Sequence, residues 1–218
     1  SHDLCLNNNP ALILVYGASI YEESDATHLG IFDIPMISNI PNLVYLAPTN
    51  KEEYFKMLDW GLNQTEHPVA IRVPVVDVVS TGEEDTTDYS ILNKSKVIKK
   101  GKDVAIIALS NFYNLGKEIA DELGDVTLIN PVYITGLDEE LLEKLKEDHK
   151  LVITLEDSVV DGGFGEKVSR FYGTSDIKVK NYGIKKSFPD RFVAKKFLIE
   201  NGISKKQIVK DIKELLEK

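Results

Sequence analysis

Cysteine is almost missing from this chain, because Cys5 is the only one among 218 residues. An internal disulfide is therefore impossible, and this fits a reducing compartment. Cys5 also has no neighbour in the sequence that would activate its thiol, which argues against a thiol nucleophile.

Long hydrophobic runs and net positive charge are missing as well. The longest apolar runs, such as ALILVY at 11–16, suit buried strands and are too short to cross a membrane. The first residues, SHDLCLNNNP, have neither the basic nor the apolar part of a secretory signal. The formal charge of −9 argues against non-specific binding of nucleic acid. We expect a cytoplasmic protein with no membrane partner and no nucleic-acid partner.

Common metal and nucleophile motifs do not occur either. The four histidines, at positions 2, 28, 67 and 149, are scattered, without H-x-x-x-H or C-x-x-C spacing. A phosphate-binding G-x-x-x-x-G-K-[ST] and an acyl-enzyme elbow G-x-S-x-G are both absent from the sequence. The sequence therefore predicts no metal site.

The first part of the sequence contains short apolar runs that predict buried parallel strands. These runs lie at 11–16, 43–47 and 69–73. Between the last two, Thr49 and Glu52 have capping-box spacing. A helix follows, with a predicted buried face of Tyr54, Leu58, Gly61 and Leu62. The resulting βαβ unit is typical of a parallel sheet covered by helices.

The sequence changes character at residues 76–97, which have an acidic, Ser/Thr-rich centre and no sustained apolar period. We interpret 76–97 as a linker between a first domain at 1–75 and a second α/β domain at 98–218. The first domain has only three clear strands, and parallel strands need neighbours, so we expect further sequence before Ser1.

In the second domain the alternation of strands and helices resumes. Strands are predicted at 104–109, 126–129, 151–157 and 177–182. Candidate helix N-caps are Asn111, Asp138, Asp190 and Ser204.

Two features at the end of strand 151–157 raise the question of a site. The GGFG stretch at 162–165 lies where many α/β proteins bind phosphate, but its spacing matches no dinucleotide fingerprint, and we favour a tight turn. Glu156 and Asp157 could act as paired carboxylates. Adjacent strand residues point to opposite faces, however, so we expect a solvated strand end instead.

His28 and Arg72 are the remaining candidates from the residues alone. His28 lies in a polar loop after a strand, where an imidazole can bond a substrate oxygen or simply bond Asp33 or the backbone. Arg72 ends the strand at 69–73, and a buried arginine must pair with a carboxylate or an anionic ligand. The sequence leaves both alternatives open for each residue.

Several motifs in order resemble 1-deoxy-D-xylulose-5-phosphate synthases, which are transketolase-like thiamine-diphosphate enzymes. The matching positions are Thr27-His28, Gly30, Phe32-Asp33, Ile40-Pro41-Asn42, Ala47-Pro48-Thr49 and the stretch PVAIRVP at 68–74. Downstream, LED…GGFG and FPDRFV resemble segments of the family's C-terminal domain. The resemblance covers nearly the whole chain.

The resemblance implies the end of a parallel-sheet pyrimidine-binding domain followed by a transketolase C-terminal-like α/β domain. It implies a catalytic role for His28 and substrate binding by Thr27, Asp33 and Arg72. It also implies thiamine diphosphate and Mg²⁺ in the complete enzyme, held by residues upstream of Ser1, so we expect neither to be bound by this chain alone. Family members suggest a homodimer with the C-terminal domain shaping assembly.

The chain departs from the family at the sugar-phosphate site. Where the resemblance leads us to expect two arginines, the sequence has Gly17 and Val75, and the acidic YEESD precedes the Thr-His pair. Losing two cations would weaken phosphate binding and leaves the acceptor open. We expect the C-terminal portion of a two-carbon transferase, inactive alone. The alternatives are a transketolase with ketose-phosphate or modified substrates, or a non-catalytic assembly module.

Overall fold

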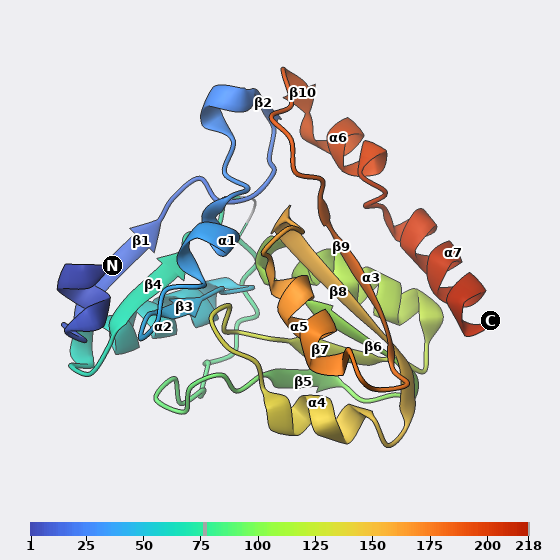
Figure 1. The fold of residues 1–218 in the computed structure, drawn as a ribbon, viewed down its shortest axis with the longest axis horizontal. Helices are drawn as coiled ribbons and strands as arrows, with labels where there is room; N and C mark the ends of the chain where they lie inside the picture. The colour runs from blue at the N-terminus through green and yellow to red at the C-terminus, as the bar shows by residue number, and fades with distance from the viewer. Residues whose placement is uncertain (76–77, 218) are drawn as a thin grey trace.

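The computed structural model describes residues 1–75 and 78–217. Its two larger sheets lie side by side (Figure 1), and a third, two-stranded sheet pairs β10 (Phe192–Val193) with β2 (Glu23–Ser24). The first has the order β1-β4-β3, formed by β1 (Ala11–Val15), β4 (Pro68–Arg72) and β3 (Val44–Leu46), and all its pairs are parallel. The three predicted strands and their parallel arrangement are thus confirmed. Short helical turns η1 (His2–Leu6) and α1 (Asp33–Ile37) and the helix α2 (Lys51–Asn63) accompany this sheet.

The second sheet has five strands in the order β5-β7-β6-β8-β9. Four of them are parallel and were predicted: β6 (Asp103–Ala108), β7 (Thr127–Asn130), β8 (His149–Val159) and β9 (Lys178–Ile184). The edge strand β5 (Lys96–Lys99) runs antiparallel to β7 and was not predicted.

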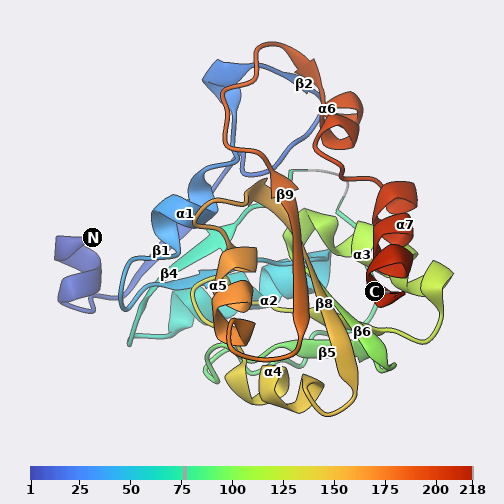
Figure 2. The same ribbon diagram turned by 45° about the vertical axis from the view of Figure 1, so that its right-hand side comes forward.

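Helices cover both faces of this second sheet (Figure 2). Along β6, Val104, Ile106 and Ala108 pack with α3 (Tyr113–Leu123) and α7 (Lys205–Leu216), whereas the alternate residues pack with α4 (Glu139–Leu145) and α5 (Phe164–Tyr172). Side chains alternate across a strand, so a strand that is apolar at every position requires a helix layer on each side.

One buried hydrophobic cluster joins the two larger sheets. Tyr45 on β3 and Ala70 on β4 belong to the same buried cluster as Ile107 on β6 and Phe164 on α5. A backbone bond from Ile134 N to the Tyr45 carbonyl (2.8 Å) also joins the two domains. The domains therefore hold each other in a fixed relation.

The described part of the predicted linker is packed against the protein. In 78–95, Tyr89 is only 1% exposed, and its hydroxyl donates to Asp85 (2.5 Å). The first two residues of the predicted 76–97 linker lie outside the described residues, and the boundaries 1–75, 76–97 and 98–218 stay predictions.

Some local predictions about helices were wrong. The α2 helix is capped by Asn50, whose side chain accepts from Glu53 N (2.9 Å), one residue later than the predicted box at Thr49. Its buried face includes Met57, whereas Leu62 is 71% exposed. Tertiary packing decides which apolar residues of an amphipathic helix face the core. The spacing in the sequence was therefore not sufficient to identify them.

Helix starts in the second domain were predicted with mixed success. Asp138 and Ser204 cap α4 and α7 as expected. Asn111 instead lies in the turn η3 (Ser110–Phe112), and α6 (Ala194–Glu200) begins after Val193 without an Asp190 cap. Within the described chain, we find no helix long and apolar enough to cross a membrane.

Candidate functional site

Two of the predicted site residues, Asp33 and Arg72, meet in a buried ion pair. Arg72 is the last residue of β4, and Asp33 begins α1. The guanidinium donates from Nε to Asp33 Oδ2 (2.8 Å) and from Nη2 to Asp33 Oδ1 (3.1 Å). This two-point contact uses the planar fork of arginine, which a lysine could not reproduce.

The same arginine also binds the second domain. Its Nη1 donates to Asp157 Oδ1 (2.5 Å) on β8, and Asp157 Oδ2 accepts from the Asn111 side chain (2.8 Å). The Tyr45 hydroxyl donates to Asp33 Oδ2 (2.5 Å). We call these five residues the interdomain ion network.

Charge and burial act in opposite directions on this network. Burial by itself would lower the pKa of Arg72, but the charges of Asp157 and Asp33 raise it above its usual value. Burial, and then the charge of Asp33, raise the pKa of Tyr45, which therefore stays a donor. The sequence left either a carboxylate or an anionic ligand as the partner of Arg72, and the structure pairs it with carboxylates. The substrate-binding roles of Asp33 and Arg72 stay predictions.

The expectation of a solvated strand end at Glu156 and Asp157 was wrong, because both side chains are fully buried. Strand β8 continues to Val159, so these residues lie inside it. They do point to different partners: Asp157 meets Arg72, and Glu156 accepts from Phe164 N (2.8 Å) and Gly165 N (2.9 Å) at the start of α5.

The GGFG stretch is thus a structural turn, as favoured. The Glu156 carboxylate already occupies the helix N-terminus where a phosphate would bind. A Cβ on Gly163 would lie 2.4 Å from Glu156 Oε2, and one on Gly165 would lie 2.5 Å from Thr154 Oγ1. Only glycine allows this close approach.

The other two predicted residues, Thr27 and His28, lie together on an exposed turn. Residues Ala26–His28 form a single helical turn, η2, whose N-cap Asp25 accepts from Thr27 N (2.9 Å) and from the Thr27 hydroxyl (2.5 Å). The Thr27 hydroxyl also lies 2.7 Å from His28 Nδ1, and the His28 side chain is 85% exposed. The hydrogen bonds among the described residues join this turn to neither Asp33 nor Arg72.

The turn belongs to a long loop that is closed at its base. A backbone bond joins Ser19 N to the Gly30 carbonyl (2.8 Å), and a Cβ on Gly30 would lie 1.6 Å from the Gly17 carbonyl oxygen. The carbonyl of the next residue, Ile31, accepts hydrogen bonds from Ser158 Oγ (2.7 Å) and Val159 N (2.9 Å) of β8. The glycine of the Thr-His-x-Gly motif therefore permits a backbone crossing.

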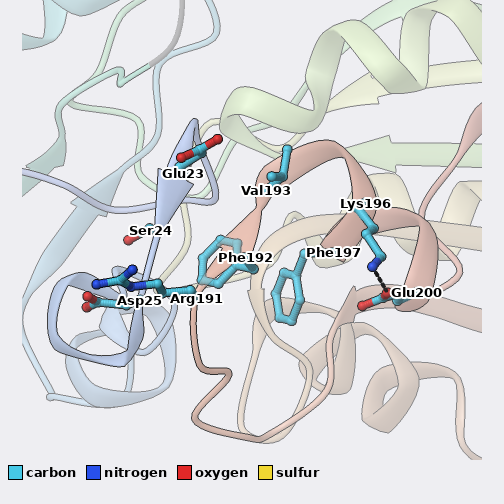
Figure 3. A pocket seen from close by; sticks show the side chains of 9 residues that line it. All are labelled: Glu23, Ser24, Asp25, Arg191, Phe192, Val193, Lys196, Phe197 and Glu200. Atoms are coloured by element: carbon cyan, nitrogen blue, oxygen red, sulfur yellow. Dashed lines mark ion pairs between the residues drawn. The ribbon is translucent and has the colours of Figure 1, made fainter.

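The tip of the loop also reaches the second domain. Strand β2 (Glu23–Ser24) pairs antiparallel with β10 (Phe192–Val193), at the top of Figure 1. Beside this pair lies a cavity of about 460 Å³, lined by residues of β2, β10 and α6 (Figure 3). Sequence reasoning missed Asp25 and the β2–β10 pair, because two-residue strands carry no periodic signal.

Residues 93–208 match the family described as "Transketolase, C-terminal domain", and residues 1–78 match "Transketolase, pyrimidine binding domain". The chain belongs to the transketolase family. The resemblance inferred from the motifs and the predicted fold class are both confirmed.

Relatives of this transketolase-family chain include two bacterial 1-deoxy-D-xylulose-5-phosphate synthases. That of Clostridium tetani is 32% identical over 99% of this chain and 35% of its own length. That of Carboxydothermus hydrogenoformans is 34% identical over 100% of this chain and 36% of its own length. The chain thus spans about a third of the length of these relatives.

A solved structure described as "Split gene transketolase, inactive beta4 tetramer" has a similar fold. The match has a TM-score of 0.74 and covers 94% of this chain and 65% of that one, at 23% identity. At this identity the likeness shows the fold alone.

Proposed function

We propose that this chain is the C-terminal portion of a thiamine-diphosphate-dependent two-carbon transferase, most like 1-deoxy-D-xylulose-5-phosphate synthase. Such an enzyme joins two carbons of pyruvate to glyceraldehyde 3-phosphate and releases CO2. The observation that carries the proposal is the match to two such synthases along 99–100% of the chain, with both family domains in order.

In this proposal His28 is the catalytic residue of the chain. Its ring is exposed, and its Nε2 can give or take a proton at a substrate oxygen. Thr27 supports the ring from the Nδ1 side. Asp33 and Arg72 would affect substrate binding only through other residues, because Arg72 is paired with both Asp33 and Asp157.

Thiamine diphosphate and Mg²⁺ belong to the proposal for the complete enzyme, where the cofactor supplies an electron sink. Residues 1–75 and 78–217 contain no group of three or more His, Cys, Asp or Glu side chains able to hold a metal ion. The proposal assigns the metal and the diphosphate to segments outside this chain.

The proposed partners are the diphosphate-binding and upstream pyrimidine-binding segments, a second copy in a homodimer, and small-molecule substrates, in the cytoplasm. We propose that the chain alone is inactive. This part of the proposal is supported by the share of the two synthases that the chain spans, which is about a third of their length.

The test uses the complete protein or complex that contains this chain, with thiamine diphosphate and Mg²⁺. We expect 1-deoxy-D-xylulose 5-phosphate from pyruvate and glyceraldehyde 3-phosphate, and no turnover from the 218-residue chain alone. Thiamine-dependent turnover by the chain alone would refute the inactive-fragment proposal. Failure of the complete protein to bind the cofactor in calorimetry would favour a non-catalytic assembly module.

One observation favours a second candidate, a transketolase-type transferase with a modified acceptor. Arg72 is bound to two carboxylates, and Gly17 and Val75 stand where the resemblance leads us to expect cations. An acceptor without a phosphate would suit this pattern. Assays that compare glyceraldehyde 3-phosphate, glyceraldehyde and a ketose phosphate separate the two candidates.

A further inference from the structure

The exposed turn at 25–28 contains a continuous chain of polar contacts that ends on the His28 ring. Asp25 Oδ1 accepts from the Thr27 hydroxyl (2.5 Å), and the same hydroxyl oxygen lies 2.7 Å from His28 Nδ1. The direct distance from Asp25 Oδ1 to His28 Nδ1 is 3.8 Å, too long for a hydrogen bond. Any effect of the Asp25 carboxylate on the ring through hydrogen bonding therefore passes through Thr27.

The number of protons available in the Asp25–Thr27–His28 contacts decides which atom donates at each contact. A hydroxyl has one proton, and the contact between Thr27 and the Asp25 carboxylate needs it, because an ionised carboxylate can only accept. The hydroxyl oxygen must then accept at its second contact. Nδ1 of His28 is therefore the donor there, and it carries a proton.

Asp25 is an acceptor at neutral pH for a local reason. The hydrogen bonds from the Thr27 hydroxyl and backbone lower the pKa of its carboxyl below the ordinary value of 3.8, against the opposing effect of burial. Glu23 and Arg191 line the same cavity, and in Figure 3 the Arg191 side chain extends toward Asp25.

We propose that Asp25 is a positioning residue that acts through Thr27 to hold neutral His28 in the tautomer with its proton on Nδ1. The lone pair then lies on Nε2, at the exposed end of the ring. A free imidazole has no such constraint, and the bond at one ring nitrogen decides the state of the other. In the sequence, Asp25 is separated from the Thr27-His28 pair by Ala26 alone.

Hydrogen bonds hold the backbone on both sides of the His28 ring. The Nε2 lone pair therefore points in one direction. Ser24 Oγ donates to the His28 carbonyl (3.1 Å), and His28 N donates to the Asp25 carbonyl (3.2 Å). Ser24 itself pairs with Phe192 of the second domain. An Nε2 lone pair held in this way can accept a proton from a substrate hydroxyl, a consequence that rests on the proposed function.

The direct test is the tautomer of His28 in the full 218-residue chain, observed by ¹⁵N NMR of the imidazole at about pH 8.5, above the usual histidine range. His28→Gln identifies the signals of this ring among the four histidines. We expect the protonated nitrogen to be Nδ1. In Asp25→Ala the freed Thr27 hydroxyl can donate to Nδ1, and we expect the proton to move to Nε2.

A second pair of variants keeps the test independent of Asp25→Ala. Thr27→Val removes the hydroxyl and should also move the proton to Nε2, whereas Thr27→Ser keeps the hydroxyl and should keep the proton on Nδ1. Glu23→Gln removes a neighbouring charge that is not among the hydrogen-bond partners of Thr27 in the described chain. Ser24→Ala removes a side-chain bond to the His28 backbone. Both controls should leave the proton on Nδ1.

Turnover of the complete enzyme gives the second readout. We expect Asp25→Ala to lower kcat, by at most the ~10⁴-fold that loss of tautomer control costs a serine protease, and to leave KM little changed. A tautomer change without loss of kcat would keep the positioning role and refute the catalytic role proposed for His28. Wild-type His28 with its proton on Nε2, or a proton that stays on Nδ1 in both Asp25→Ala and Thr27→Val, would overturn the inference.

Discussion

The interdomain ion network allows one stability prediction to be worked out in detail, for Arg72→Leu. The Arg72 side chain is 1% exposed, and those of Asp157 and Asp33 are 0% and 8% exposed. Leucine would leave two buried carboxylates without their cation. Breaking a buried ion pair by removing one partner costs about 3–5 kcal/mol of folding free energy.

The network itself places this variant toward the lower end of that range. Asp157 would keep the bond from Asn111, and Asp33 would keep the bond from Tyr45, so neither carboxylate loses all its donors. We expect a loss of about 3 kcal/mol, which corresponds to a fall in Tm of about 6–12 °C for a chain of this size.

Urea unfolding measures the loss with two probes. Fluorescence of Trp60, the only tryptophan, reports the first domain, and far-ultraviolet circular dichroism reports both. Because a buried cluster still joins the two sheets, both probes should follow one transition in the wild type and in Arg72→Leu, so that one free energy of unfolding describes each protein. The exposed pair of Lys117 and Asp121 serves as control, and Lys117→Ala should leave both midpoints unchanged. A loss below about 1 kcal/mol in Arg72→Leu would refute the reasoning.

Further predictions concern α5, pH and the exposed turn. Gly165→Ala should cost about 1–3 kcal/mol in urea unfolding through its clash, whereas Gly173→Ala, with its nearest contact at 3.4 Å, should cost nothing. Burial raises the pKa of Glu156 from 4.5 to about 8, so between these pH values the native state binds a proton that the unfolded state has lost. The free energy of unfolding should therefore fall as the pH rises from 4.5 to about 8, and Glu156→Gln should reduce this dependence. Burial, then Arg170, lowers the pKa of Lys167 from 10.5 to about 8, so stability rises between pH 8 and 10.5, and Lys167→Met should remove that rise. His28→Ala should lower turnover of the complete enzyme while Tm stays unchanged; a large fall in Tm with normal turnover would reverse its assignment.

The strands were predictable because their signal is local. The six successive apolar or small residues at 104–109, five of which lie in β6, indicate a strand buried on both faces. The helices α3 and α5 lie on those opposite faces as the pattern requires. The edge strand β5 has the sequence KVIK and pairs antiparallel, so it lacks the continuous apolar run that indicates a central strand.

The partners of the candidate site residues were not predictable in the same way. Arg72 and Asp157 are 85 residues apart in the sequence, and the apolar run that led to the prediction of β8 stops before Glu156. The strand nevertheless continues to Val159, which pairs with Ile184 of β9 after a shift in register beyond Leu155. In the sequence, a carboxylate that follows the apolar run looks like the end of the strand, although pairing with β9 carries the strand past it.

Contacts from the C-terminal domain hold the loop on both sides of the turn that carries His28. Ser158 and Val159 bond the loop at Ile31, and Phe192 of β10 pairs with Ser24 at its tip. Both attachments come from the C-terminal domain matched at 93–208, and they lie on either side of the His28 turn in the sequence. Because the turn itself is exposed and contributes little buried surface, its position depends on these two attachments. A substitution in β10 that breaks the pairing should therefore loosen the Asp25–Thr27–His28 contacts without touching any of the three residues.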